Sequence, residues 1–224
     1  MATPLLNLDD FDLPRFIAIE GPIGVGKTTL AKKLAESFRY PTMLEPSTEN
    51  PFLDRFYREG GRHALPTQLF FLLHRSQQFT ELSTAGLFSP VVVSDFLMQK
   101  DRMFAEITLD PNELALYEKI QENLDIKPPC PDLVIYLQAP ERVLMERIRS
   151  RGVAPEQHIN SDYLHTLVEA YARFFHFYDE APLLIVNAAE VDLAGNDDHY
   201  RELIERIVNM HGPRQYFNPH PTLI

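Results

Sequence analysis

The sequence has few of the features that mark secreted or membrane-bound proteins. It contains one cysteine, Cys130, so no intrachain disulfide is possible. No apolar run approaches the roughly 20 residues that cross a bilayer. The N-terminal stretch "MATPLLNLDDFDLP" lacks the basic start and apolar core of a signal peptide. We therefore expect a cytoplasmic protein with no membrane partner.

Basic residues are also scarce. The chain has 21 Lys and Arg against 32 Asp and Glu, which gives a formal net charge of −11. This charge argues against broad binding to nucleic acid, and it requires basic side chains to be concentrated wherever a phosphate is bound. The 8 histidines are scattered without ligand spacing, so we expect no histidine metal site.

Short apolar runs alternate with helix-like segments along the chain. The runs are 16–20, 42–45, 90–94, 132–137 and 183–187, and the helical patterns cover 27–38, 65–83, 110–124, 140–150, 161–179 and 198–210. Such alternation predicts an α/β fold with a doubly wound, five-stranded parallel sheet and helices on both faces. The length of 224 residues suits one large domain. We expect this domain at 14–211, an N-terminal extension at 1–13 and a C-terminal tail at 212–224, docked through Tyr216 and Phe217.

The stretch "FIAIEGPIGVGKTT" places Gly21, Gly26, Lys27 and Thr28 at the spacing G-x-x-x-x-G-K-[ST], between an apolar run and a helical pattern. In this context the loop's backbone N–H groups face phosphate oxygens at the positive end of a helix. Lys27 can then bridge the β- and γ-phosphates, and Thr28 can ligate Mg²⁺. The alternative is a plain glycine turn. We predict a nucleoside triphosphate site formed by Gly21, Gly24, Val25, Gly26, Lys27, Thr28 and Thr29.

Two carboxylates stand at the ends of apolar runs. Asp95 follows "VVVS" and is placed to hold Mg²⁺ directly or through water, although a helix N-cap would look the same. Glu45 ends "TML" and precedes Pro46, which keeps it extended. Glu45 can act as the general base toward an attacking hydroxyl, or it can be a surface glutamate before a turn.

Two polar patterns lie on predicted helices. Arg147 and Arg151 are four residues apart and could form a lid over the triphosphate, or a solvated helix face paired with glutamates. Gln68 and Arg75 share a face of an otherwise apolar helix, where they could read a heterocyclic base or form an ordinary polar stripe.

Taken together, these segments resemble the deoxynucleoside kinase family, in particular its bacterial deoxyguanosine and deoxyadenosine kinase branch. The resemblance covers about 15–210 and is carried, in order, by "IEGPIGVGKTT", "EPSTENPFLDRFY", "VVVSDFLMQKDRMFA" and "YLQAPERVLMERIRSRGVAPEQHI". It implies a P-loop kinase with a short arginine-bearing lid, commonly a homodimer. The implied activity is transfer of phosphate from ATP, with Mg²⁺, to the 5′-hydroxyl of a small-molecule deoxynucleoside.

The resemblance also implies a role for each site residue. Glu45 would be the base for the 5′-hydroxyl, and Tyr57 with Glu156 would hold the 3′-hydroxyl. The other roles are base reading by Gln68, Arg75 and Asp101, an aromatic wall at Phe104, the magnesium shell at Asp95 and Thr28, and catalytic cations at Lys27, Arg147 and Arg151. The segment "SDFLMQK" is similar to the purine branch, so we expect a purine deoxynucleoside to be preferred.

Two positions depart from the family pattern. Phe96 stands where an arginine often follows the acidic residue, so the cation beside Glu45 is unassigned, with Lys100 and Arg102 as candidates. Val153 stands where the lid often has another arginine.

Three other functions stay open. A thymidylate-like monophosphate kinase is disfavoured because Leu44 replaces the arginine expected before its glutamate-proline pair. A non-catalytic nucleotide sensor and a kinase of another hydroxylated ring compound are the other two.

Overall fold

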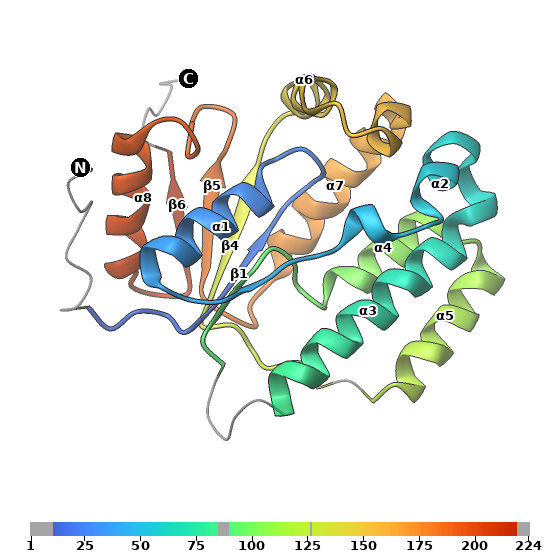
Figure 1. Ribbon diagram of the computed structural model, residues 1–224, viewed down its shortest axis with the longest axis horizontal. Helices are drawn as coiled ribbons and strands as arrows, with labels where there is room; N and C mark the ends of the chain where they lie inside the picture. Colours follow the sequence, from blue (N-terminus) through green and yellow to red (C-terminus); the bar gives the residue numbers. More distant parts are fainter. Residues whose placement is uncertain (1–10, 85–89, 126, 219–224) are drawn as a thin grey trace.

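The computed structural model describes residues 11–84, 90–125 and 127–218. Its centre is a parallel sheet of six strands in the order β2-β3-β1-β4-β5-β6 (Figure 1). The strands are β1 (Phe16–Glu20), β2 (Thr42–Met43), β3 (Val92–Ser94), β4 (Leu133–Gln138), β5 (Leu183–Asn187) and β6 (Arg214–Phe217). The predicted doubly wound α/β fold is confirmed.

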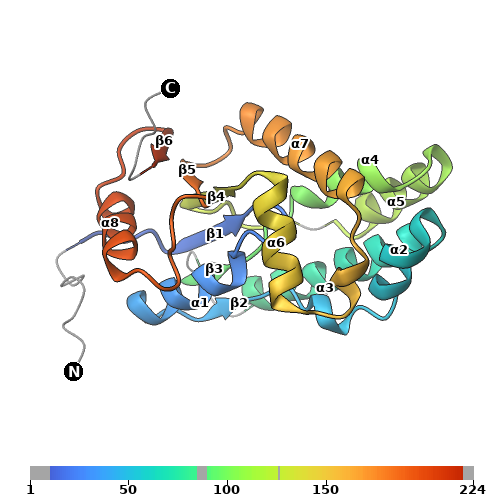
Figure 2. The ribbon, with the colours of Figure 1, turned by 90° about the horizontal axis from the view of Figure 1, so that it is seen from above.

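Helices cover both faces of this sheet. They are α1 (Lys27–Phe38), α2 (Leu53–Glu59), α3 (Ala64–Thr84), α4 (Lys100–Thr108), α5 (Pro111–Asn123), α6 (Glu141–Arg151), α7 (Ser161–Phe177) and α8 (Asp197–Val208). Short 3₁₀ turns occur at Ser47–Glu49, Gly60–His63 and Pro155–His158. Seen from above, α1 and α7 lie on opposite sides of the strands, and α6 crosses over the end of the sheet (Figure 2). No helix in the described ranges is long and apolar enough to cross a lipid bilayer.

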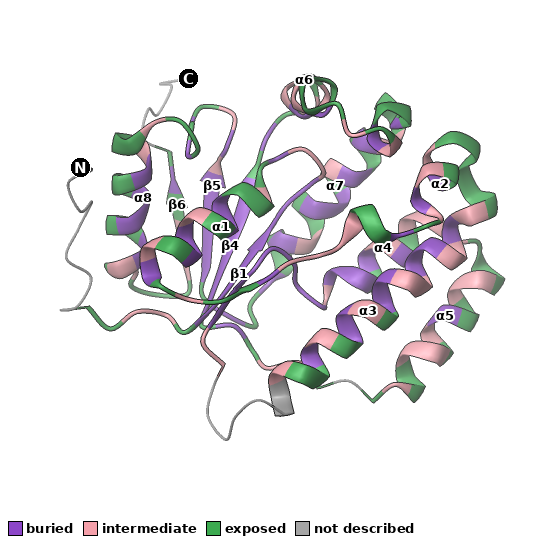
Figure 3. Ribbon diagram, viewed as in Figure 1, coloured by how far each residue is buried: buried purple, intermediate pink, exposed green. Residues whose placement is uncertain are grey.

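The buried strands account for the apolar runs in the sequence. All five residues of β1 are buried, as are the first five of β4, because helices pack on both faces of the sheet (Figure 3). Helix boundaries follow local capping chemistry. Asp110 accepts hydrogen bonds from the backbone N–H of Asn112 and Glu113, with Pro111 at the first helical turn, so α5 begins where the sequence predicts.

The predicted number of five strands is wrong, because the tail contributes a sixth. Residues 214–217 pair in parallel with β5, with Leu183 opposite Arg214. The Arg214 guanidinium donates to the carbonyls of Phe175, His176 and Tyr178, which fixes the tail to the end of α7. Phe217 is buried while Tyr216 is exposed, so only one of the two aromatics docks as expected. A short edge strand with one buried apolar side chain gives no apolar run to detect.

Helices α2 and α4 were not predicted. In α4 the first two residues, Lys100 and Asp101, are buried rather than exposed. Charged side chains that face inward reverse the amphipathic pattern by which a helix is detected, so the sequence gives little signal for α4. These inward charges belong to the candidate site.

Candidate active site

The glycine loop joins β1 to α1 and requires glycine at its turns. Gly21 and Gly24 have φ of 147° and 84°, in the region that side chains rarely adopt. A Cβ on Gly21 would lie 2.4 Å from the carbonyl oxygen of Leu137, and one on Gly24 would lie 2.8 Å from Cγ1 of Ile148. The loop therefore packs against β4 and α6, and its backbone leads directly into the N-terminus of α1.

Lys27 lies over this loop. Its Nζ donates to the carbonyl oxygens of Gly21 and Pro22, at 2.7 and 3.3 Å. Burial lowers the pKa of Lys27 and the neighbouring Lys100 lowers it further, while nearby carboxylates act in the opposite direction. Two carbonyl oxygens thus accept hydrogen bonds from the ammonium, and phosphate oxygens could accept them in the same way.

Asp95, at the carboxyl end of β3, is hydrogen-bonded to residues of two other segments. Its Oδ2 accepts a hydrogen bond from Thr28 Oγ1 at 2.5 Å, and its Oδ1 accepts one from the backbone N–H of Glu45 at 2.7 Å. The predicted pair of Thr28 and Asp95 is thus brought together. Their hard oxygen donors suit Mg²⁺, which keeps several waters and phosphate oxygens as ligands. Within the described ranges no group of three or more His, Cys, Asp or Glu side chains could hold a metal alone.

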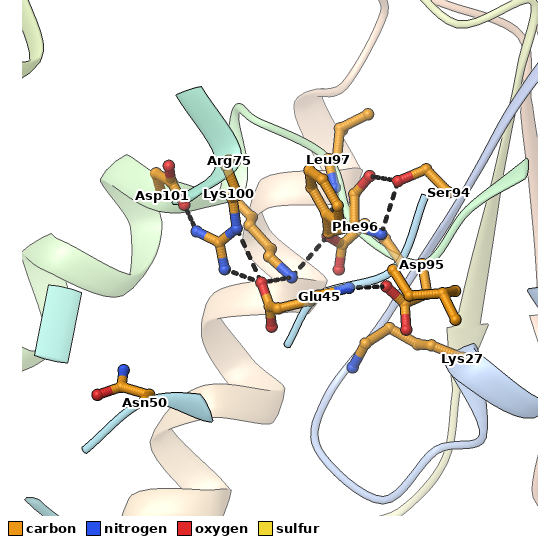
Figure 4. A network of polar contacts seen from close by, with 12 residues as sticks. Lys27, Glu45, Asn50, Arg75, Ser94, Asp95, Phe96, Leu97, Lys100 and Asp101 are labelled. Carbon is orange, nitrogen blue, oxygen red and sulfur yellow. Dashed lines mark hydrogen bonds and ion pairs between the residues drawn. The ribbon is translucent and has the colours of Figure 1, made fainter. Parts of the chain in front are cut away.

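The Glu45 carboxylate is held by two buried cations (Figure 4). Its Oε1 accepts from Nε of Arg75 at 2.8 Å, also from Nη2 of Arg75, and lies 3.3 Å from Nζ of Lys100. Burial alone would raise the pKa of Glu45, but the charges of Arg75 and Lys100 outweigh it and lower the pKa to about 2. Glu45 is therefore ionised at neutral pH and able to accept a proton.

One cavity connects this carboxylate to the glycine loop. Its lining includes five residues of the glycine loop and the start of α1, Gly24, Gly26, Lys27, Thr28 and Thr29, and Asp95 of the predicted magnesium shell. It also includes six of the residues predicted to contact the acceptor: Glu45, Tyr57, Gln68, Arg75, Phe104 and Glu156. The seventh, Asp101, is not part of the lining. It lies behind Arg75 and pairs with Nη1 of that arginine.

The comparisons with known proteins agree with this geometry. The family model described as "Deoxynucleoside kinase" matches residues 17–211. The chain belongs to the deoxynucleoside kinase family. A deoxyguanosine kinase of Bacillus subtilis (strain 168) is 40% identical over 157 residues, covering 70% of this chain and 76% of the relative. A deoxyadenosine/deoxycytidine kinase of the same organism is 27% identical, covering 87% and 92%.

Solved structures of the deoxynucleoside kinase family share the fold. A deoxyadenosine kinase from M. mycoides, solved with the products dCMP and dCDP, superposes with a TM-score of 0.74 at 26% identity. The match covers 87% of this chain and 98% of that one. The resemblance inferred from the ordered motifs is therefore confirmed.

The two predicted lid arginines of this deoxynucleoside kinase lie in different places. Arg151 lines the cavity and pairs through Nη2 with Glu156. Arg147 instead donates to the carbonyl of Ala188 at 2.7 Å and to that of Val25 at 3.3 Å. It lines a second cavity on the other side of the glycine loop. The structure thus separates Arg147 from Glu45.

The residues predicted to contact the acceptor combine polar and aromatic side chains. Burial raises the pKa of Tyr57 well above its ordinary value, with smaller effects of Tyr163 and Glu156 in the same direction. Gln68 is buried and donates to Oγ1 of Thr108 at 3.2 Å. The Tyr57 hydroxyl, the Glu156 carboxylate and the Gln68 amide line the same cavity, so the site offers polar groups that can recognise a sugar and a heterocycle.

Several residues at the cavity were not predicted as site residues. Tyr171 and Phe71 are among those that line it, and Glu20, at the end of β1, contacts two lining residues, Tyr171 and Lys100. Of the two candidate partners of Glu45, Lys100 makes the contact. Arg102 is largely exposed and pairs with Glu106 and Glu118. The available sequence signal for Glu20 was a carboxylate at the end of an apolar run, directly before the glycine loop.

Proposed function

We propose that this chain transfers the γ-phosphate of ATP to the 5′-hydroxyl of a deoxynucleoside, with Mg²⁺, and prefers a purine base. The observation that carries the proposal is that one cavity is shared by the loop and the predicted acceptor residues. Its lining includes Lys27 and Thr28 as well as Glu45, Gln68 and Arg75. A phosphate-binding loop and an ionised base must face the same space if a hydroxyl is to attack the terminal phosphate.

The reaction follows from these positions. Lys27 and the N–H groups at the start of α1 bind the phosphates and neutralise charge on the transferred group. Glu45 accepts the proton of the 5′-hydroxyl while the hydroxyl oxygen bonds to the γ-phosphorus, and the bond from the γ-phosphorus to the bridging oxygen breaks to release ADP. Arg151 adds positive charge above the transfer. Thr28 and Asp95 fit Mg²⁺, which when bound neutralises the β- and γ-phosphate oxygens.

The acceptor is recognised by the far end of the cavity. We assign Tyr57 and Glu156 to the 3′-hydroxyl, Gln68 and Arg75 to the edge of the base, and Phe104 to its face. Asp101 acts through Arg75, because it pairs with that guanidinium and does not line the cavity. The second cavity, lined by Thr29, Arg147 and Ala188, is assigned to the donor nucleoside, with Arg147 fixed against two carbonyls.

A purine is favoured by the names of the relatives. The 40% identical relative is a deoxyguanosine kinase, whereas the 27% identical one is named for both deoxyadenosine and deoxycytidine. Competition among the four deoxynucleosides at equal concentration tests the choice through kcat/KM. We expect deoxyguanosine or deoxyadenosine to lead. A clear preference for deoxycytidine or thymidine would overturn the purine assignment and leave the kinase assignment standing.

A monophosphate acceptor is disfavoured by position 44. Leu44 packs against the core, so no cation at this position meets an acceptor phosphate. Phosphorylation of dTMP in preference to any deoxynucleoside would overturn our choice.

The working unit is proposed to be a cytoplasmic homodimer that binds neither nucleic acid nor membrane. The net charge of −11 supports the absence of nucleic-acid and membrane binding. Support for the dimer comes from the groove between α4 and α7, which is lined by Met103, Ile107, Phe174 and Phe177. The Phe177 side chain there is 75% exposed. Light scattering should give twice the chain mass, and Phe177→Asp should lower it; a monomeric wild type contradicts the assignment.

A further inference from the structure

Glu20 is a buried carboxylate that none of the proposed roles uses. It is the last residue of β1, and its exposed fraction is 0%. Its Oε2 accepts from the N–H of Gly21 at 3.0 Å and from the hydroxyl of Tyr171 at 2.9 Å. Its Oε1 accepts from the N–H of Leu97 at 2.8 Å. These three donors, two backbone N–H groups and one hydroxyl, hold the Glu20 carboxylate in one orientation.

The charge of Glu20 is balanced by Lys100, the first residue of α4. Nζ of Lys100 lies 3.2 Å from Oε1 of Glu20 and 3.3 Å from Oε1 of Glu45. Lys100 is 2% exposed and lines the cavity. The ammonium is therefore shared between a carboxylate that cannot move and the carboxylate proposed as the base.

Position 96 explains why a lysine is needed here. Phe96 is fully buried and packs edge-on against Phe79, with ring centroids 5.6 Å apart. Nζ of Lys100 lies 5.9 Å from the centre of the Phe96 ring. An aromatic side chain cannot form an ion pair with a carboxylate, whereas Lys100, four residues later, reaches the Glu45 carboxylate from beside the Phe96 ring.

We propose that Glu20 and Lys100 form a positioning pair, in which Glu20 anchors the Lys100 ammonium and Lys100 orients the Glu45 carboxylate toward the acceptor hydroxyl. The proposal rests on the proposed kinase function. It gives Lys100 the role of the arginine that the family pattern often has at the position of Phe96. Tyr171 extends the pair, because its hydroxyl is bound to Glu20 while its ring lines the cavity beside Phe104.

The first test compares Lys100→Met with Lys100→Arg and the wild type. Lys100→Met should lower kcat by on the order of a hundredfold, with the KM for the deoxynucleoside changed only a few-fold. Lys100→Arg keeps the charge and should restore much of the loss. Lys119→Met removes an exposed lysine of α5 and should leave both constants unchanged.

The pH profile gives a second readout. The charged and titratable groups around Glu45 are Lys27, Arg75, Asp95 and Lys100, with Glu20, Tyr57 and Tyr171 beyond them. Loss of the Lys100 charge should let Glu45 protonate at higher pH. The ratio of variant to wild-type kcat/KM should therefore fall further as the pH is lowered.

A double variant separates positioning from stability. Each single change, Glu20→Gln or Lys100→Met, leaves one buried charge without its partner and should lower the melting temperature. The double variant removes both charges, so its melting temperature should recover toward that of the wild type. Its kcat should stay as low as that of Lys100→Met.

The outcomes are distinct. Recovery of kcat together with the melting temperature in the double variant would make the pair structural and overturn the proposal. A Lys100→Met variant with normal kcat and an unchanged pH profile would also overturn the proposal. If the wild type itself transfers no phosphate to any deoxynucleoside, the proposed function fails first, independently of the variants.

Discussion

Glu45→Gln is the perturbation that isolates proton transfer in this site. Glutamine has nearly the shape of glutamate, and its oxygen can still accept from Arg75 and Lys100, which hold Oε1 of Glu45 in the wild type. The substitution removes the negative charge and the site that accepts the proton of the 5′-hydroxyl. The glycine loop and the residues assigned to sugar and base are unchanged.

The size of the effect follows from this role. A positioned general base contributes about 10²- to 10⁴-fold in rate, which corresponds to about 3–5 kcal/mol of activation free energy. Because Gln68, Tyr57 and Glu156 still line the cavity, binding of the deoxynucleoside should change little. We therefore expect the loss in kcat and only a small change in KM.

The assay is the initial rate of monophosphate formation from deoxyguanosine at saturating ATP and Mg²⁺. Glu49→Gln is the matched control, since it makes the same chemical change at an exposed glutamate of the same segment. Thermal melts of both variants check folding. A Glu45→Gln protein with wild-type kcat and a raised KM would reduce Glu45 to a binding residue and refute the reasoning.

Three further predictions concern the loop and the charge network. Lys27→Ala should lower turnover by orders of magnitude with an unchanged melting curve, and near-normal turnover would remove Lys27 from catalysis. Gly21→Ala should lower both the melting temperature and ATP affinity, because its Cβ would lie 2.4 Å from a backbone oxygen; unaltered values for both would contradict the close packing. The pKa of Glu45 is lowered from 4.5 to about 2, so its contribution to folding, about 3 kcal/mol, is complete above about pH 4.5 and lost as the pH falls toward 2. Denaturant unfolding at several pH values should show this loss for the wild type but not for Glu45→Gln.

Much of the site could be predicted because parallel strands end at one edge of the sheet. The glycine loop follows β1, Glu45 follows β2 and Asp95 follows β3, so sequence position alone places Lys27, Glu45 and Asp95 together. The hydrogen bonds of Asp95 to Thr28 and to the backbone of Glu45 confirm that these segments meet. The metal and catalytic roles of these residues stay predictions.

The parts that could not be predicted depend on how helices are rotated and where they pack. Arg147 and Arg151 are one turn apart on α6, yet Arg147 is bound to carbonyls beside the second cavity while Arg151 reaches Glu156. Lys100 looks like a surface lysine until α4 is seen to turn it inward toward Glu20. Buried charge pairs between distant segments leave no periodic pattern, because neither partner determines the position of the other along the chain.

The most direct test of the kinase assignment is to incubate the purified chain with ATP, Mg²⁺ and each natural deoxynucleoside, ribonucleoside and nucleoside monophosphate, and to identify the phosphorylated product. We predict 5′-monophosphates of deoxynucleosides, with dGMP or dAMP formed fastest, and stoichiometric formation of ADP. Formation of diphosphates from added monophosphates, or ATP binding with no phosphate transferred to any of these acceptors, would contradict the assignment.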